Sequence, residues 1–293
     1  MKASFYLLIA AVFWGLNFHF AQIMLQSSSS TEAGFWRFLF GVATLTLLSY
    51  KKLPSLNLWR THFKGFLLVG FVGSFIFNIF FFWGMLTTSP LNAALIMSLN
   101  PAVTLIFSRI FLKTKLHVKQ VIGILVAFVG VLYLLVKGNL AALQHFSFTT
   151  GDLLIFIANA IFAMQHIWTK KYTGGITIRD FTLLTNVVCL LCFLAILPFT
   201  PVQSISMHRW PFWVSAIGIG TLGTAIAFLL WNDGLKMIGP GRAGIFINIV
   251  PLSTALTGVW LGKPLQFYHL VSGIIIISGL VIMQYQRRTY SLK

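Results

Sequence analysis

About ten runs of mainly apolar residues, each 17 to 24 residues long, follow one another through the sequence, with connections of at most about 15 residues. A helix of about 20 apolar residues spans the hydrocarbon core of a bilayer. Only 9% of the residues are charged, against about 25% in an ordinary soluble domain. The sequence therefore predicts an all-α membrane protein with ten transmembrane helices, and most soluble enzymes and binding modules are excluded. The predicted spans are 4–25, 33–50, 64–86, 91–112, 118–136, 152–172, 180–198, 212–235, 242–261 and 267–285.

Lysine and arginine are distributed unequally between the two sets of loops and adjoining helix ends. With the N-terminus placed in the cytoplasm, 17 of the 21 basic residues fall on the cytoplasmic side. The other four, expected outside, are Arg37, Lys137, Arg209 and Lys263. Because basic residues concentrate on the cytoplasmic side of membrane proteins, we expect both termini in the cytoplasm. The net charge of +17 is spread over short loops, so we expect no nucleic-acid partner.

The chain repeats itself at an offset of 150 residues. Residues 70–124 aligned with 220–274 give twelve identities, which include four glycine pairs and two proline pairs. These residue types mark positions where backbone geometry matters. Each half contains five spans, an odd number, so equivalent helices must cross in opposite directions. We expect two inverted five-helix repeats, 1–136 and 152–293, joined by an external linker at 137–151, as in many secondary transporters.

Motifs of soluble enzymes give no support for catalysis. Segments 218–223 and 239–244 match G-x-G-x-x-G, but neither belongs to a βαβ unit, and the sequence has no G-x-x-x-x-G-K-[ST]. Cys189 and Cys192 lie inside an apolar span and lack a second pair for a zinc site. Three of the four acidic residues lie at helix ends or in loops, and Asp233 lies in the last turn of the eighth span. We expect no enzyme activity, no metal and no cofactor.

Polar residues near the middle of the predicted spans are costly when they face lipid, so we expect them to face the protein interior. Interhelical hydrogen bonding, worth about 0.6 kcal/mol each, is the alternative use for any single one. Pro101 and Pro251 are related by the repeat and fall in the middle of the fourth and ninth spans. Each is expected to kink its helix and to free the carbonyl four residues earlier. Interrupted helices at matching places indicate a midplane binding site, and a kink that only helps packing is the alternative.

The chain resembles the ten-helix EamA-type transporters of the drug/metabolite transporter superfamily over nearly its whole length. The residues that carry the resemblance are Trp14-Gly15, the helices with Pro101 and Pro251, Arg242-Ala243 and the glycine-rich fifth and tenth spans. The resemblance implies a central cavity walled mainly by the third, fourth, eighth and ninth helices. It also implies export of small metabolites, commonly amino acids, from bacteria. Family members often carry Glu where this sequence has Lys113 and Lys263, so no role of those carboxylates is carried over.

We therefore expect a transporter of the bacterial inner membrane that exports a small metabolite, above all an amino acid, by alternating access and without ATP. The expected partners are the small-molecule substrate and the lipid bilayer, and no oligomer is required. The residues expected to line the cavity are Trp14, Asn17, Asn78, Phe82, Ser98, Gln165, His166, Trp231, Asn232 and Asn248.

Two alternatives stay open. One is an importer or exchanger of sugars or phosphorylated compounds. The other, of a different class, is a membrane enzyme or a lipid-binding partner that transports nothing. Because the sequence has no acid at the midplane, we expect movement down the gradient of the metabolite itself, and proton coupling through His19 or His166 is the alternative.

Overall fold

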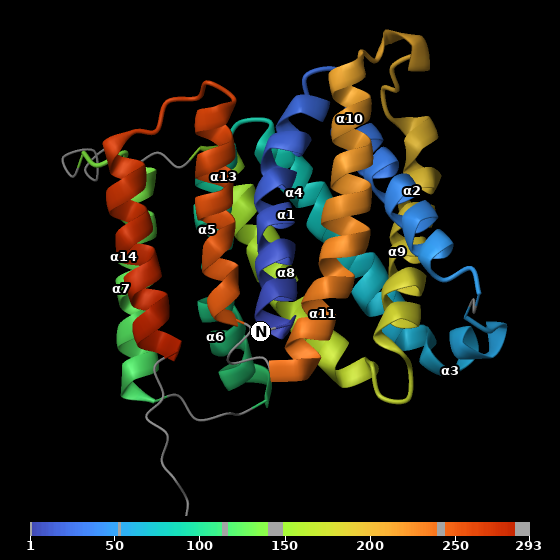
Figure 1. Ribbon diagram of the computed structural model, residues 1–293, viewed down its shortest axis with the longest axis horizontal. Coiled ribbons are helices and arrows are strands. Elements are labelled where there is room, and N and C mark those ends of the chain that lie inside the picture. The colour runs from blue at the N-terminus through green and yellow to red at the C-terminus, as the bar shows by residue number, and fades with distance from the viewer. Residues whose placement is uncertain (1, 52–53, 113–116, 140–148, 239–243, 285–293) are drawn as a thin grey trace, which may run out of the picture.

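The computed structural model describes residues 2–51, 54–112, 117–139, 149–238 and 244–284, and within these ranges it contains helices and no strand. The helices stand side by side in one bundle (Figure 1). The all-α fold predicted from the sequence is confirmed. The elements of the first half are α1 (Lys2–Met24), α2 (Ser30–Leu48), α3 (Leu56–Phe66), η1 (Leu67–Ile76), α4 (Phe77–Met85), α5 (Pro90–Met97), α6 (Asn100–Leu112) and α7 (Val118–Leu135).

The second half follows the same plan. Its elements are α8 (Thr150–Tyr172), α9 (Ile178–Ile196), η3 (Leu197–Phe199), η4 (Ile205–Met207), α10 (Trp210–Gly218), η5 (Ile219–Ile226), α11 (Ala227–Ile238), η6 (Gly244–Asn248), α13 (Ile249–Trp260) and α14 (Phe267–Gln284). Helical residues occupy all ten predicted ranges. The third helical range begins at Leu56 rather than at residue 64, because polar residues such as Arg60 form helical turns that the apolar run does not include. A kink at His62 separates these turns from the rest of the helix.

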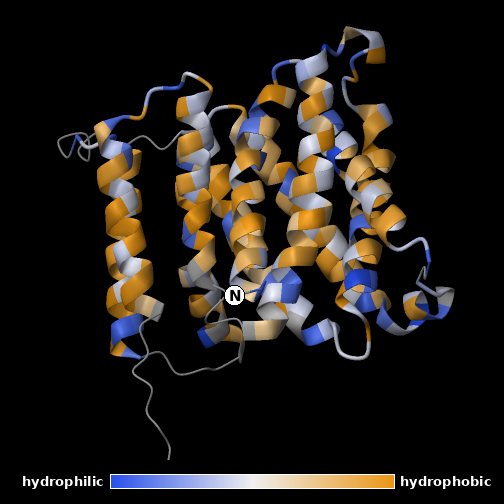
Figure 2. Ribbon diagram, in the orientation of Figure 1, coloured by the Kyte–Doolittle hydropathy of each residue, from blue (hydrophilic) through white to orange (hydrophobic). Residues whose placement is uncertain are grey.

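The described residues contain seven helices that are long and apolar enough to cross a bilayer. Two shorter apolar helices, Phe246–Trp260 and Phe267–Met283, accompany them. Helix α2, which contains Glu32 and Arg37, belongs to neither group. Hydrophobic residues predominate along the helices, while many of the hydrophilic ones lie near the helix ends (Figure 2). The protein is thus a multi-pass membrane protein, and the number of ten spans stays a prediction.

Equivalent helices of the two halves pack against each other in opposite directions. Helices α7 and α14 lie side by side (Figure 1), with Gly123 against Gly279 and Gly130 against Ile276. Residue numbers therefore rise along one helix as they fall along the other. Helices α2 and α9 behave in the same way, because the start of α2 packs on the end of α9 and Leu45 lies in one cluster with Leu183. The inverted-repeat architecture is confirmed.

Three of the four acidic residues lie in the first turn of a helix. In each case a Ser or Thr hydroxyl accepts a hydrogen bond from the backbone N–H of the acidic residue three positions later, which satisfies one of the free donors at a helix start. The negative charge near the helix N-terminus also stabilises the helix dipole. The pairs are Ser29 with Glu32, Thr149 with Asp152 and Thr177 with Asp180. The predicted linker at 137–151 lies largely outside the described residues, and its role stays a prediction.

Candidate functional site

Two π-helical segments, η1 and η5, occupy matching places in the two repeats, and the 150-residue offset aligns Gly70 with Gly220. A Cβ atom on Gly70 would lie 2.8 Å from the backbone oxygen of Thr185 on α9. A Cβ atom on Gly220 would lie 2.7 Å from the backbone oxygen of Arg37 on α2. Only glycine allows these close approaches. Departures from α-helical winding of this kind occur frequently at functional sites, which directs attention to the residues around η1 and η5.

Gly223 in η5 is the meeting point of two predicted cavity residues. Trp14 Nε1 donates a 3.1 Å hydrogen bond to the Gly223 oxygen, and the Asn17 amide packs so closely that any side chain at position 223 would collide with it. Asn17 is buried, and its Oδ1 accepts no hydrogen bond among the described residues. The Trp14 ring also lies 4.9 Å from the ring of Trp231, centroid to centroid. Three predicted residues from α1 and α11 therefore lie together.

A second group surrounds η1. Gln165 of α8 packs on Gly73, much as Asn17 packs on Gly223 in the other half. Gln165 Nε2 donates to Ser74 Oγ at 3.3 Å, and Asn78 Nδ2 donates to the Ser74 backbone oxygen at 2.8 Å. Asn78 is buried, and its Oδ1 has no partner in the described part of the chain. The two halves therefore place amide side chains against corresponding glycines.

Three other predicted residues have different surroundings. Phe82 of α4 is fully buried and packs edge-on against Phe81, with ring centroids 5.4 Å apart. The ring of His166 lies 4.5 Å from the ring of Phe162 on the same helix. Asn232 of α11 is partly exposed, and its side chain makes no hydrogen bond within the described ranges.

Both prolines lie where a helix starts again. Pro101 is the second residue of α6, which follows α5 after a break of two residues. Pro251 is the third residue of α13, which follows the 3-10 turn η6. The first turn of a helix tolerates proline, because its N–H groups have no acceptor within the helix. Asn248 ends this turn, is buried, and has an Oδ1 without a partner among the described residues. Arg242 and Ala243, just before it, lie outside the described residues.

A side chain from α8 bridges the break between α5 and α6. Asn159 Nδ2 donates to the Ile96 backbone oxygen at 2.9 Å, and Asn159 Oδ1 accepts from Asn100 Nδ2 at 2.8 Å. Ser98, in the break itself, donates from Oγ to the Leu95 oxygen at 2.6 Å. The polar side chains of this break therefore have partners within the protein.

Arg37 does not lie where the charge count placed it. It was assigned to the external loops and helix ends, but it is the eighth residue of α2 and only 6% exposed. Its Nε donates to Thr224 Oγ1 at 3.1 Å, and its guanidinium lies 5.7 Å from the ring centroids of Phe38 and Phe81. The assignment failed because the count treated every basic residue as a loop marker. The missed signal was an ionisable residue inside an apolar run, which usually marks a functional site.

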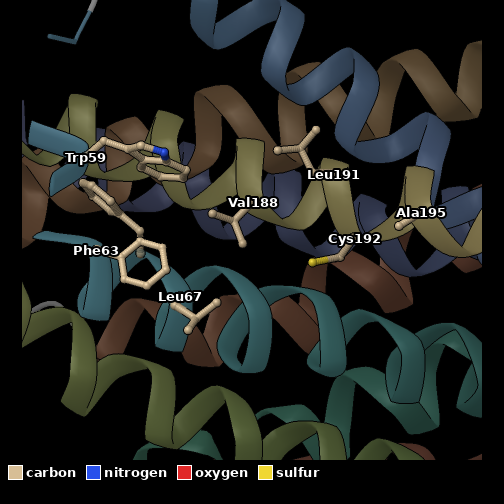
Figure 3. A pocket seen from close by; sticks show the side chains of 8 residues that line it. Trp59, Phe63, Leu67, Val188, Leu191, Cys192 and Ala195 are labelled. Carbon is tan, nitrogen blue, oxygen red and sulfur yellow. The ribbon is translucent and has the colours of Figure 1, made fainter. Parts of the chain in front are cut away.

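Two pockets among the described residues are lined by none of the ten predicted cavity residues. The larger pocket, about 290 Å³, is an apolar groove between α3, η1 and α9 (Figure 3). Trp59, Phe63 and Leu67 form one side and Leu191 and Cys192 the other. Its lining suits a hydrocarbon chain and not a polar metabolite. The central cavity stays a prediction.

The smaller pocket, about 80 Å³, lies between α1, α5 and α13 and is lined in part by His19 and Lys263. Lys263 Nζ donates to Gln22 Oε1, and His19 Nε2 lies 2.8 Å from the Thr254 oxygen. Partial burial lowers the pKa of Lys263 below its ordinary value. Lys113, the repeat counterpart of Lys263, lies outside the described residues. No group of three or more His, Cys, Asp or Glu side chains within those residues is placed to hold a metal ion.

Comparison with known proteins decides the family. A model of the EamA-like transporter family matches residues 1–136 and again residues 149–285. The chain belongs to the EamA-like transporter family. This family is part of the drug/metabolite transporter superfamily, so the resemblance inferred from the sequence is confirmed and the protein is a membrane transporter.

Similar proteins agree with this assignment. The Bacillus subtilis protein YyaM, described as an uncharacterized transporter, is 30% identical over 274 residues, which cover 92% of this chain and 90% of YyaM. YrdR from the same organism, with the same description, is 27% identical and covers 96% of this chain and 91% of its own length. A solved crystal structure matches with a TM-score of 0.67 at 17% identity, covering 96% of this chain and 95% of the other. At that identity the match shows the fold alone.

Proposed function

We propose that this protein is a secondary transporter that exports an amino acid across the bacterial inner membrane by alternating access. Its termini lie in the cytoplasm, as the distribution of basic residues predicts. In agreement, α1 begins and α14 ends at the same side of the bundle (Figure 1). The inverted repeat supports alternating access, since the two halves can exchange two packings around one site.

Three buried amide oxygens carry the proposal. The Oδ1 atoms of Asn17, Asn78 and Asn248 accept no hydrogen bond among the described residues. A buried acceptor without a partner costs about 1–3 kcal/mol. Three of them, on α1, α4 and η6, support a ligand that supplies several donors. An ammonium group has three N–H donors and no acceptor, so the amino group of an amino acid matches this need.

Aromatic rings beside these amides suit the rest of such a molecule. Trp14 packs against Trp231 and Phe228, with centroids 4.9 and 5.3 Å away. Phe18, next to Asn17 in sequence, packs against Phe81 at 5.6 Å. Binding sites for small molecules combine such apolar walls with a few polar groups that fix orientation. A small amphipathic metabolite therefore fits this region better than a fully polar sugar.

Counterflow in proteoliposomes tests the proposal. Vesicles that contain the purified protein are loaded with one L-amino acid at a time, and entry of the same labelled amino acid is followed. We expect exchange of at least one amino acid, without ATP and absent from protein-free vesicles. Glucose and glucose 6-phosphate serve as the comparison. Exchange of these compounds alone would contradict the amino-acid assignment and favour the sugar or phosphorylated-compound alternative.

Direction is tested in cells. Bacteria that overproduce the protein and are fed a dipeptide of the exchanged amino acid should release that amino acid faster than cells with the empty vector. Faster uptake of the external amino acid with no faster release would contradict export.

A further inference from the structure

Arg37 is a buried cation without a counter-charge in the described part of the chain. Its side chain leaves α2 and enters the bundle, and only 6% of the residue is exposed. A charged side chain at membrane depth is expensive and normally pairs with an opposite charge. Among the described residues, however, the ion pairs are Arg179 with Asp180 and His208 with Glu32, and no carboxylate contacts Arg37. The cost of burying this charge needs another explanation.

The contacts that Arg37 makes orient its guanidinium without neutralising it. Its one described hydrogen bond runs from Nε to Thr224 Oγ1 at 3.1 Å. Phe38 and Phe81 lie against the cation at 5.7 Å, a distance at which an aromatic face attracts it. A guanidinium has five N–H donors, so the four on the two Nη nitrogens have no acceptor among the described residues. Neither Nη atom is among the enclosed polar atoms that lack partners, whereas Asn17 Oδ1 and Asn78 Oδ1 are.

Arg37 and the unpartnered amides converge on the same part of the bundle. Thr224, which holds Arg37, follows Gly223, against which Asn17 packs. Phe81, which faces the guanidinium, lies three residues after Asn78 on α4 and also contacts Phe18 beside Asn17. Thr224 stands midway along the continuous helix formed by α10, η5 and α11. The guanidinium of Arg37 and the free amide oxygens of Asn17 and Asn78 are therefore connected through shared neighbours near mid-height of the bundle.

We propose that Arg37 binds the carboxylate of the transported metabolite through its two Nη nitrogens, which makes it the residue that selects carboxylates. This inference rests on the proposed amino-acid transport and adds the site of the second charged group. The planar guanidinium matches a carboxylate with two parallel hydrogen bonds. The amino group of the same molecule lies toward the free oxygens of Asn17 and Asn78. The ligand thus supplies the missing counter-charge each time the carrier is loaded.

A comparison of amino acids with their primary amides distinguishes carboxylate binding by Arg37 from a purely structural role of Arg37. The amide keeps the amino group and the side chain of the amino acid but lacks its negative charge. The purified protein is heated with each of the twenty L-amino acids, and every one that raises the melting temperature is compared with its primary amide. Affinities follow from the concentration dependence of the shift. The variants are Arg37→Gln and Arg37→Lys, and Arg209→Gln, at the exposed start of α10, is the matched control.

We expect the wild type and Arg209→Gln to bind the amino acid at least about tenfold more tightly than its amide. Arg37→Gln should weaken binding of the acid by about tenfold to a hundredfold and leave the amide unchanged, because a hydrogen-bonded charge is lost. If Arg37→Gln does not fold, Arg37→Lys decides. A lysine supplies only a point charge and no planar pair of donors. A loss of affinity for the amino acid that exceeds the loss of affinity for its amide therefore supports the proposal.

Three results would overturn the inference, and they show whether the transport proposal fails with it. If amino acids bind and are exchanged but Arg37→Gln still prefers the acid over the amide as strongly as the wild type, Arg37 has only a structural role and the transport proposal stands. Equal losses for acid and amide in Arg37→Lys lead to the same conclusion. If no amino acid shifts the melting temperature of the wild type and none is exchanged, the transport proposal fails and the inference fails with it.

Discussion

His208 Nε2 lies 2.7 Å from Glu32 Oε1 in a pair whose two side chains are almost completely buried. The pair connects the first turn of α2, in one repeat, to the segment that precedes α10 in the other. Glu32 Oε2 also accepts a hydrogen bond from the backbone of Gln203 at 3.2 Å, and the His208 ring stacks on Phe212 with centroids 3.8 Å apart. This contact fixes one end of the bundle.

Removing one member of the Glu32–His208 pair should cost more than removing both. Glu32→Leu or His208→Phe alone leaves a buried polar partner, which lowers the free energy of unfolding by about 1–3 kcal/mol. The double variant should lose clearly less than the sum of the two, because neither polar group is then left alone. Unfolding of the four proteins in detergent measures this coupling, and strictly additive losses would show that the two side chains do not stabilise each other.

The two prolines should matter for transport more than for folding. In Pro101→Ala the new N–H can donate to the Met97 carbonyl, and Pro251→Ala likewise lets α13 extend toward η6, so the interrupted helices can straighten. Both variants should insert and elute like the wild type while counterflow slows several-fold. Pro201→Ala, in an exposed loop, is the matched control and should transport normally. Full transport activity in both helix variants would show that the helix breaks serve packing and not transport.

An imposed pH gradient should leave the accumulation limit of the substrate unchanged. In the described part of the chain no carboxylate forms an ion pair with Arg37, and His19 already contacts the Thr254 carbonyl. His166→Gln and His19→Gln should therefore change affinity at most, with exposed His117→Gln as the control. Accumulation against a gradient that is driven by protons, and that disappears in either histidine variant, would prove the carrier to be proton-coupled.

Reporter fusions test the topology. The basic residues and the odd number of spans in each repeat predict that a reporter after Lys293 faces the cytoplasm, and one inserted after Asn139 faces the outside. Reporter activity should differ between the two fusions. Activity on the same side would remove the basis for the external linker.

Much of the fold follows from the sequence because lipid selects long apolar runs, and periodic apolar segments need no knowledge of distant partners. The odd number of spans in each repeat also predicted that equivalent helices are inverted. The glycine pairs predicted positions where backbone geometry matters, and Gly70 and Gly220 do meet neighbouring backbone at close range. The third helix exceeds its predicted range because hydropathy does not detect a polar extension such as the turn with Arg60.

The candidate site was less predictable, because its contacts join residues far apart in the chain. Trp14, Asn17 and Trp231 were selected as polar or aromatic residues in spans, and the structure does bring them together. Arg37 was missed, since its partner Thr224 lies 187 residues away and a charge count contains no distances. Ser98 was selected for its polarity, but its hydroxyl already bonds a carbonyl one turn earlier.

The proposed substrate site includes Asn17, which packs on Gly223 of η5, and the Gly223→Ala variant tests that site most directly. The added methyl group would occupy the space of the Asn17 amide, whereas Gly174→Ala adds a methyl group in open space and is the matched control. Counterflow of the amino acid identified with the wild type is measured in proteoliposomes for the three proteins. We expect wild-type rates for Gly174→Ala and less than about a tenth of that rate for correctly folded Gly223→Ala, because the added methyl group displaces the Asn17 amide from the site. Wild-type exchange by Gly223→Ala would contradict the account.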